Sequence, residues 1–367
     1  MKICCVFNYN PHYRFPIYKS ISEKFDCDFY FGDNVFTPLK QFDPNKLKGF
    51  KGYLRAKKTN FKGFIWHKGF RNIFSLKYTH YIITGDTAIL INWLIILFAK
   101  LTGRKVFAWT HGINSSNIKS HTKLLLKAFF LPMDGILMYN EYNCKYMSML
   151  GCKKERLHVI HNSLDTEVQT EIYNTLKPKN IYSEHFGNNY PTIIFIGRVQ
   201  KVKRTSMILE AMNILRAEGI MSNLIVVGEN VDDKEFDNKI KEYNLQENIW
   251  IYGPCFDERI NAELIYNANV CVSPGNVGLA AIHCHTYGTP VVTNNNFSKQ
   301  MPEFEAITEG VTGSFFKEND AQSLAENIKP WLTLSQEERK NTRKVARKEI
   351  EENWSVKSQI DLLKRVL

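Results

Sequence analysis

Residues 270–293 read VCVSPGNVGLAAIHCHTYGTPVVT, and this stretch decides the fold of the second half of the chain. An apolar run at 270–272 ends at a turn that contains Gly275. Gly278 and Leu279 then open a short predicted helix, and Val291 begins the next strand. A strand that enters a helix through a glycine turn presents unpaired backbone N–H groups and the positive end of the helix dipole. The pattern predicts an anion site, usually for phosphate, although the same turn can serve packing alone.

The same alternation of strand and helix extends over the whole chain. Apolar runs predict strands at 2–8, 27–31, 78–84, 105–109, 135–139, 157–160, 192–196, 224–227 and 249–252. Helical patterns occupy 15–25, 88–101, 118–130, 141–150, 205–218, 234–243, 259–268, 320–332 and 336–352, and a terminal helix begins at Val356. Strands separated by helices predict an α/β fold with parallel, doubly wound sheets.

The length of 367 residues suits two domains. A polar linker at 177–191 separates them, so we expect a first domain at 1–176 and a second at 190–353, with the helix at about 354–367 returning to the first. Two Rossmann-like domains of similar size are expected to face each other across a cleft at the carboxyl ends of both sheets, where ligands of open α/β sheets bind.

The net charge of +11 is unevenly distributed. Residues 1–175 hold 25 Lys and Arg against 12 Asp and Glu, and segment 46–77 has ten cations, seven aromatic residues and no acid. An anionic membrane surface fits such a segment, because aromatic residues favour the interface while cations meet lipid phosphates. A nucleic acid and a solvated face without a partner are the alternatives.

Targeting and redox features favour the cytoplasm. An apolar strand follows Met1 and Lys2 directly, without the features of a secretory signal, and the apolar run 88–99 is too short to span a bilayer. The eight cysteines show no paired metal-ligand spacing, so we expect reduced thiols and no zinc.

Two cations follow the first strand of the second domain. Arg198 comes after Gly197, and Lys203 lies five residues further on. Arg supplies a planar fork and Lys a point charge, so the pair suits a diphosphate. A basic surface turn is the alternative, since Lys201 and Arg204 are also there. The glycine turn in the same domain favours the diphosphate.

The motifs of residues 190–315 resemble those of glycosyltransferase family 4, whose members have the GT-B fold. The matching motifs are, in order, Gly197-Arg198 with Lys203, Tyr252-Gly253, Ser273-Pro274-Gly275, Gly278-Leu279, Gly288-Thr289-Pro290-Val291-Val292, Glu305 and Gly310-Val311-Thr312-Gly313. In the first half, His111 ends a strand where the family places a His beside the donor sugar.

The chain departs from this family in its first loop, where residues 8–14 (NYNPHYR) hold no Gly-Gly pair, and at two positions of the second half. The family usually carries two Glu separated by seven residues, and here these positions hold Gly275 and His283. His283 can offer a ribose diol one donor and one acceptor. Asn276 is expected to replace the first Glu in part. We therefore expect a subfamily with altered donor contacts, and a degenerate enzyme is the alternative.

The resemblance implies a hexosyltransferase that moves a sugar from a nucleotide diphosphate-sugar to a hydroxyl, with retention at the anomeric carbon and without a metal or further cofactor. The catalytic residues are then His111, Arg198 and Lys203; the diphosphate and sugar contacts are Asn276, Val277, Gly278, Leu279 and Glu305; and the nucleoside contacts are Gly253, Pro254, Cys255 and His283.

The basic first domain suits a polyprenyl-diphosphate-linked or other glycan acceptor at the inner face of the cytoplasmic membrane. We therefore expect a peripheral bacterial enzyme of capsule, O-antigen or exopolysaccharide synthesis that binds no nucleic acid. A nucleotide-sugar 2-epimerase with the GT-B fold and a catalytically silent sugar-nucleotide-binding subunit are the alternatives.

Overall fold

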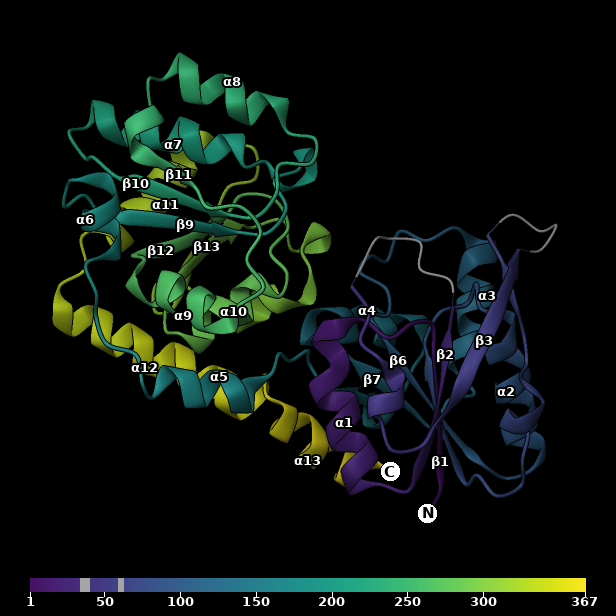
Figure 1. The fold of residues 1–367 in the computed structure, drawn as a ribbon. Helices are drawn as coiled ribbons and strands as arrows, with labels where there is room; N and C mark the ends of the chain where they lie inside the picture. Colours follow the sequence, from purple (N-terminus) through teal and green to yellow (C-terminus); the bar gives the residue numbers. More distant parts are fainter. Residues whose placement is uncertain (34–39, 59–62) are drawn as a thin grey trace. The chain divides into compact units, whose positions relative to one another are not determined.

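A computed structural model describes residues 1–33, 40–58 and 63–367 (Figure 1). The chain divides into two compact units. Unit 1 comprises Met1–Leu164 and Val356–Leu367, and unit 2 comprises Asp165–Ser355. The division falls at residue 164, earlier than the expected 176, because the helix that follows Asp165 packs within the second unit. Both units have the predicted α/β architecture, in which mostly parallel strands are covered by helices.

Unit 1 is built on an eight-stranded sheet within the described residues, in the order β4-β3-β2-β1-β5-β6-β7-β8. All neighbouring pairs are parallel except β3 and β4. Its strands are β1 (Ile3–Phe7), β2 (Cys27–Gly32), β3 (Phe50–Lys58), β4 (Ile65–Lys68), β5 (His80–Thr84), β6 (Lys105–Thr110), β7 (Gly135–Met138) and β8 (Leu157–Val159). Its helices are α1 (Phe15–Lys24), α2 (Leu90–Leu101), α3 (Ser120–Phe130), α4 (Glu141–Leu150) and α13 (Val356–Val366).

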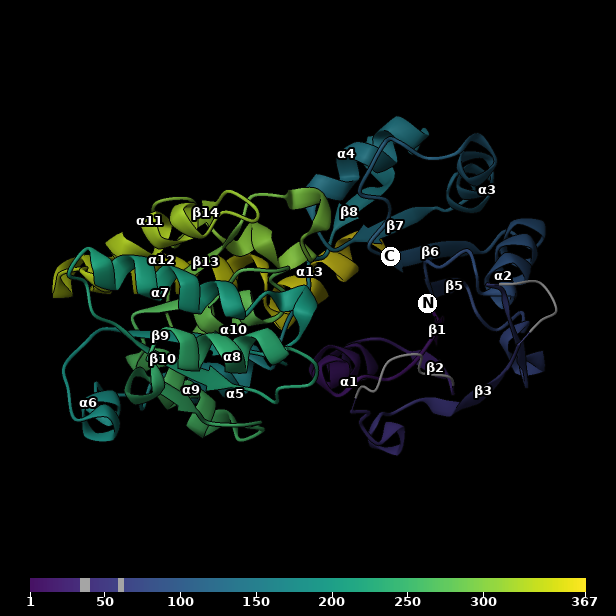
Figure 2. The ribbon, with the colours of Figure 1, turned by 90° about the horizontal axis from the view of Figure 1, so that it is seen from above.

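Alternating side chains of β1 explain why helices cover both faces of this sheet. Ile3, Cys5 and Phe7 point into a core completed by α1 and α13, whereas Cys4 and Val6 point into a core completed by α2, α3 and α4. Successive strand residues face opposite sides of a sheet, so a fully apolar strand needs a helical layer on each side. Figure 2 shows these layers from above.

Unit 2 is built on a six-stranded parallel sheet within the described residues, in the order β11-β10-β9-β12-β13-β14. Its strands are β9 (Thr192–Ile196), β10 (Asn223–Val227), β11 (Ile249–Ile251), β12 (Val270–Ser273), β13 (Val291–Asn294) and β14 (Gly313–Phe316). Its helices are α5 (Thr166–Tyr173), α6 (Ile181–Phe186), α7 (Ser206–Ala217), α8 (Lys234–Glu242), α9 (Glu258–Asn267), α10 (Ala280–Thr286), α11 (Ala321–Leu332) and α12 (Gln336–Asn353).

Each sheet contains a point at which the strand order reverses. In unit 1, β1 pairs with β2 on one side and with β5 on the other. In unit 2, β9 pairs with β10 on one side and with β12 on the other. Loops at the carboxyl ends of such strands diverge and leave a crevice that binds ligands. The reversal points therefore indicate where a site can form in each unit.

Segment 46–77, which interrupted the predicted alternation, supplies β3 and β4, although its residues 59–62 lie outside the described part. The expected linker at 177–191 contains α6, whose Tyr182 is buried and donates a hydrogen bond to the carbonyl of Leu264. Among the described residues, no helix combines the length and apolar composition required to cross a bilayer.

Candidate functional site

The predicted donor-site residues of unit 2 gather at its reversal point. Gly197 and Arg198 follow β9, and Gly275 and Asn276 follow β12, the neighbouring parallel strand. Gly197 has φ 140°, a conformation that favours glycine. Arg198 is exposed, and its charge lowers the pKa of Lys203. The charge of Arg198 therefore acts on the Lys203 ammonium.

Lys203 connects the cationic turn to the glycine turn. Its Nζ donates hydrogen bonds to the backbone oxygen of Asn276 at 2.6 Å and to Asn276 Oδ1 at 2.8 Å. Desolvation lowers the pKa of Lys203 to about 8, with Arg198 acting in the same direction and Glu303 opposing both. An ammonium has three donors, so one remains for a ligand. An incoming anion would stabilise its charged form.

The backbone requires glycine at 275. Its N–H donates to the carbonyl of Lys203 at 2.9 Å. A Cβ at this position would lie 2.3 Å from the carbonyl oxygen of Val202 and 2.7 Å from Lys203 Cα. No side chain fits there without moving the backbone of the cationic turn. The absence of the first family Glu is therefore tied to close packing of the two loops.

The loop between Gly275 and α10 presents backbone amides beside the cations. The amide of Val277 is already used, since it donates to Gln300 Oε1 at 2.7 Å. Within the described chain, the amides of Gly278 and Leu279 donate no hydrogen bond. A Cβ at Gly278 would meet nothing nearer than Met301 Cγ at 3.8 Å, so this part of the loop is open. Of the predicted contacts, Gly278 and Leu279 have amides that can bind an anion, whereas the amide of Val277 fixes the loop through Gln300.

The sequence did not distinguish the role of Glu303 from that of Glu305. Both lie on the 3-10 turn Pro302–Ala306. Glu303 is 2% exposed, and its charge favours the protonated form of Lys203. Glu305 is half-buried. Of these two residues, Glu303 is therefore the one whose charge acts on Lys203.

The predicted nucleoside loop leads into a carboxylate that sequence analysis missed. Gly253 has φ 85°, and the carbonyl of Cys255 accepts a hydrogen bond from Asn261 at 3.3 Å. Pro254, between them, is exposed. Helix α9 begins at Glu258, three residues after Cys255.

Glu258 and His283 form one unit. Glu258 Oε1 lies 2.9 Å from His283 Nε2 and accepts from Tyr287 at 2.6 Å and from Gln169 at 2.9 Å. Burial alone would raise the pKa of Glu258, but these hydrogen bonds, His283 first, lower it. Glu258 Oε2 receives no hydrogen bond from the described residues. Helix α10 has His283 where the family has its second Glu, and this His pairs with a carboxylate from α9.

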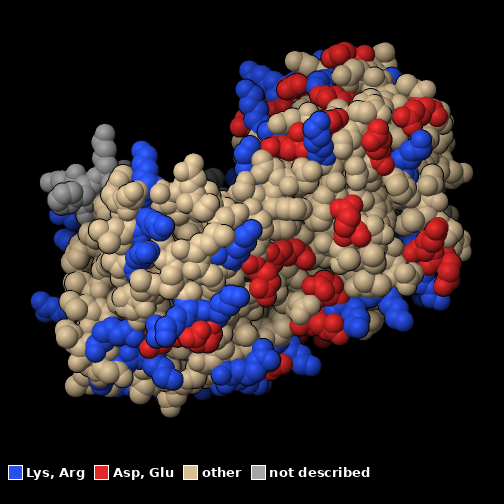
Figure 3. All heavy atoms as spheres, turned by 180° about the vertical axis from the view of Figure 1, so that it is seen from behind, with Lys and Arg blue, Asp and Glu red and all other residues tan. Residues whose placement is uncertain are grey.

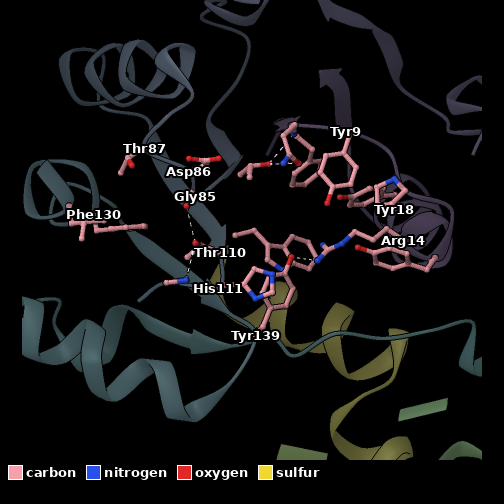
Figure 4. Close-up of a pocket in the computed structure, with 18 residues that line it drawn as sticks. Tyr9, Arg14, Tyr18, Gly85, Asp86, Thr87, Thr110, His111, Phe130 and Tyr139 are labelled. Atoms are coloured by element: carbon pink, nitrogen blue, oxygen red, sulfur yellow. Dashed lines mark hydrogen bonds between the residues drawn. The ribbon is translucent and has the colours of Figure 1, made fainter. Parts of the chain in front are cut away.

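His111 lies in a cavity of about 400 Å³ within unit 1, at the carboxyl ends of β1, β5 and β6 (Figure 4). Its carbonyl accepts from Asn143 Nδ2 at 2.7 Å. The next residue, Gly112, has φ 66° and donates to Thr110 Oγ1 at 3.0 Å. Thr110 Oγ1 in turn donates to the carbonyl of Gly85 at 2.9 Å. These contacts fix the turn that presents His111.

His111 is a neutral imidazole near pH 7. Its ring centroid lies 4.4 Å from that of Tyr139. Although the residue as a whole reaches solvent, desolvation of its ring, followed by the charge of Arg14, lowers its pKa to about 4. A neutral imidazole carries one donor and one acceptor, so His111 can bind a hydroxyl or a carbonyl oxygen without bringing a charge.

Comparison with known proteins places part of the chain in relation to a known family. Residues 177–349, within unit 2, match the family model described as glycosyl transferases group 1. An uncharacterized 41.2 kDa protein in the cps region of Klebsiella pneumoniae is 26% identical over 246 residues, which are 63% of this chain and 63% of that protein. The chain therefore spans less than two thirds of the length of this curated relative.

Solved structures resemble the whole chain. HepE (Alr3699) of Anabaena in complex with UDP is 14% identical, with a TM-score of 0.75 over 100% of this chain and 99% of that one. The apo lipopolysaccharide outer core galactosyltransferase WaaB is 14% identical, with a TM-score of 0.71 and the same coverage. A glycosyltransferase from Rickettsia africae ESF-5 is 16% identical, with a TM-score of 0.72 over 100% and 98%.

The fold is GT-B. The predicted fold class is thereby confirmed, since the two parallel-sheet units match these structures over the full chain. At such low identities the likeness of structure shows the fold alone. The family match, which is confined to unit 2, supports a glycosyltransferase domain there.

Proposed function

We propose that the protein is a retaining, metal-independent hexosyltransferase that moves a sugar from a nucleotide diphosphate-sugar to a hydroxyl of a glycan or lipid-linked acceptor. The observation that carries this proposal is the convergence of Arg198, Lys203 and the open amides of Gly278 and Leu279 at the reversal point of unit 2. The match to glycosyl transferases group 1 covers all of these residues. The UDP complex of HepE supports a nucleotide-sugar donor.

The proposed role of the two cations follows from the charge that develops during transfer. As the bond between the anomeric carbon and the diphosphate breaks, negative charge grows on the leaving oxygen. Arg198, Lys203 and the amides of Gly278 and Leu279 are in place before the reaction, so they can stabilise this charge without reorganising. Fixed cations can do this without a metal ion, and we expect EDTA to leave transfer unchanged.

We assign recognition of the donor ribose to Glu258 together with His283. Each ribose hydroxyl can donate one hydrogen bond, and Glu258 Oε2 is available as an acceptor beside the His283 ring. The adjacent loop with Gly253, Pro254 and Cys255 is then the contact for the base. Asn276 and Glu305 are assigned to the transferred sugar, and His111 is assigned to hydrogen bonding with the donor sugar or its diphosphate.

We place the acceptor on unit 1 and the reaction in the synthesis of a bacterial surface polysaccharide such as capsule, O-antigen or exopolysaccharide. The cps-region relative and the lipopolysaccharide galactosyltransferase support this assignment. We further propose that the protein works at the inner face of the cytoplasmic membrane.

Membrane contact is proposed to use segment 46–77. On the described part of this segment, Lys51, Arg55 and Lys57 are exposed on β3, and Leu76 is 66% exposed. Lys and Arg gather on unit 1, whereas acidic residues are frequent on unit 2 (Figure 3). Part of this charge is structural, because Lys51 and Lys77 both pair with buried Asp28. Binding to acidic liposomes at physiological salt, weakened by Arg55→Glu with Lys57→Glu, tests the contact.

The function is tested by incubating the protein with UDP-, GDP-, ADP-, CMP- and dTDP-sugars and a set of glycan and lipid-linked acceptors. Mass spectrometry measures the product and the released nucleotide, and NMR of the product gives the anomeric configuration. Transfer from one donor with retention is expected. Binding of a donor without transfer to any acceptor would instead favour the silent subunit, for which the loss of the two family Glu is the specific observation.

A further inference from the structure

The cavity of unit 1 contains a buried cation that the proposed function does not use. Arg14 precedes α1 and is 9% exposed. Its guanidinium carbon lies 5.1 Å from the ring centroid of Trp109 and 4.9 Å from that of Tyr139. It donates a hydrogen bond to the Tyr139 hydroxyl, and Tyr13 and Tyr18 lie near enough to affect its pKa. Figure 4 shows Arg14 extending between Tyr18 and Tyr139 toward His111.

No carboxylate of the described residues pairs with Arg14. Asp86 also lines the cavity, but its Oδ1 accepts from the amide of Ala88 at 2.8 Å, and it forms no ion pair with Arg14. The undescribed residues 34–39 and 59–62 contain no Asp or Glu. Burying a charge without a counter-ion is strongly unfavourable, and aromatic faces and neutral hydroxyls offset this only in part. The arrangement therefore favours a ligand that brings its own negative charge.

The rest of the cavity suits a sugar ring. Its volume of about 400 Å³ is in the range of small-molecule sites. Tyr9 and Tyr13, which are partly exposed, supply aromatic rings to the lining, and Thr87 supplies a neutral group that can bind a hydroxyl. A guanidinium has five donors in a planar fork. Three tyrosine hydroxyls can occupy at most part of them, which leaves donors for a planar or tetrahedral oxyanion.

We propose that this cavity binds a sugar that carries an anionic substituent, a carboxylate or a phosphate, and that Arg14 pairs with the anion. This inference deepens the proposed function and rests on its placement of the acceptor on unit 1. The acceptor is then a uronic acid or a phosphorylated sugar at its recognised end. Arg14 binds the anion, while neutral groups of the cavity such as Thr87 bind the ring hydroxyls.

The experiment measures direct binding to the full-length protein without any nucleotide, by isothermal titration calorimetry or by ligand-observed NMR. The probes are methyl glucuronide, glucose 1-phosphate, neutral methyl glucoside and inorganic phosphate. We expect one of the two anionic sugars to bind roughly tenfold to a hundredfold more tightly than methyl glucoside. Tighter binding of methyl glucuronide would identify the anion as a carboxylate, and tighter binding of glucose 1-phosphate would identify it as a phosphate. Equal binding of all three sugars, or binding of inorganic phosphate as tight as that of the better sugar, would overturn the inference.

Two variants locate the anion contact. Arg14→Gln is expected to remove the preference for the anionic sugar, whereas Arg71→Gln, at an exposed arginine of the same unit, is expected to keep it. If Arg14→Gln does not fold, Arg14→Lys keeps the charge but loses the fork, and a weaker preference is then expected. A preference that survives in a folded Arg14→Gln protein would contradict the inference.

The binding test also separates this inference from the proposed function. Transfer to neutral acceptors by a protein that does not prefer anionic sugars would overturn the inference alone. Tight binding of an anionic sugar by a protein that neither binds a nucleotide-sugar nor transfers a sugar would overturn the proposed function alone.

Discussion

The Lys203 ammonium is hydrogen-bonded to both oxygen atoms of Asn276, at 2.6 Å and 2.8 Å. One cation therefore has two tasks, since it fixes the loop after β12 and also carries charge at the proposed diphosphate site. A substitution of Lys203 removes both, whereas a substitution of Asn276 removes only the side-chain contact. The pair can thus separate the positioning of the loop from the stabilisation of charge.

Replacing Lys203 by Ala should lower turnover by about a hundredfold or more, because preorganised charge acts most strongly in the transition state. Asn276→Ala keeps the cation and the bond to the backbone oxygen, so a smaller loss is expected. Steady-state kinetics with the donor identified by binding measures both. Arg216→Ala, on α7 away from the loop, serves as the control. Equal, small losses for Lys203→Ala and Asn276→Ala would remove Lys203 from the chemistry.

Binding of the donor should weaken as the pH rises through 8. The pKa of Lys203 is lowered to about 8, and only its charged form pairs with a diphosphate. Between pH 7 and pH 9 the dissociation constant of a nucleoside diphosphate should increase roughly tenfold through this single group. Calorimetry at several pH values tests this. Lys203→Arg should keep binding nearly constant over the same range, and an equal pH dependence in that variant would assign the titration to another group.

The lowered pKa of Lys203 affects stability in the opposite direction: the folded protein should become more stable as the pH rises. An unfolded lysine titrates near 10.4, so the unfolded chain binds more protons than the folded protein between about pH 8 and pH 10. The contribution of Lys203 to the free energy of unfolding should therefore rise with pH in this window. Comparison of denaturant unfolding in the wild type and in Lys203→Gln, from pH 7.5 to 10, measures it.

Glu258→Gln should weaken nucleotide binding about tenfold, because a charged acceptor for a ribose hydroxyl becomes neutral. Binding of inorganic diphosphate should not change, since the cations are untouched. Glu263→Gln, on the same helix but paired with Lys179, is the matched control. If Glu258→Gln weakened nucleotide and diphosphate binding to the same extent, Glu258 would act on the fold of the site and not on the nucleoside.

Gly275→Ala should destabilise the protein by about 1–3 kcal/mol, the usual effect of overpacking a closely packed site. The added Cβ would lie 2.3 Å from the carbonyl oxygen of Val202. Gly278→Ala, where the space is open, should leave the free energy of unfolding nearly unchanged. Thermal and denaturant unfolding compare the two. A fully stable Gly275→Ala protein would show that the loops do not require glycine.

Local sequence patterns predicted most of the regular structure. The helix Glu141–Leu150 has the predicted bounds because Asn140 caps its start and Gly151, with φ 114°, ends it. The buried strand Thr192–Ile196 is an apolar run that needs no further signal. Such elements are determined by capping and periodicity, which a single sequence reveals.

The remaining features depend on contacts between distant segments. Helix α6 is short and lies in a polar stretch, and Tyr182 holds it against a helix some eighty residues away. Glu258 meets His283 only because α9 and α10 pack together. Arg14 gave no signal in the sequence, since its uncompensated charge becomes evident only once its aromatic neighbours are placed around it.

Binding of nucleotide-sugars to the wild type and to Arg198→Ala tests the central claim most directly. Thermal unfolding is measured with UDP-, GDP-, ADP-, CMP- and dTDP-sugars, because a ligand that binds only the folded state raises its apparent stability. The account predicts a shift with one nucleotide family in the wild type and a much smaller shift in a folded Arg198→Ala protein. No shift with any nucleotide, or an equal shift in both proteins, would contradict a donor site at Arg198 and Lys203.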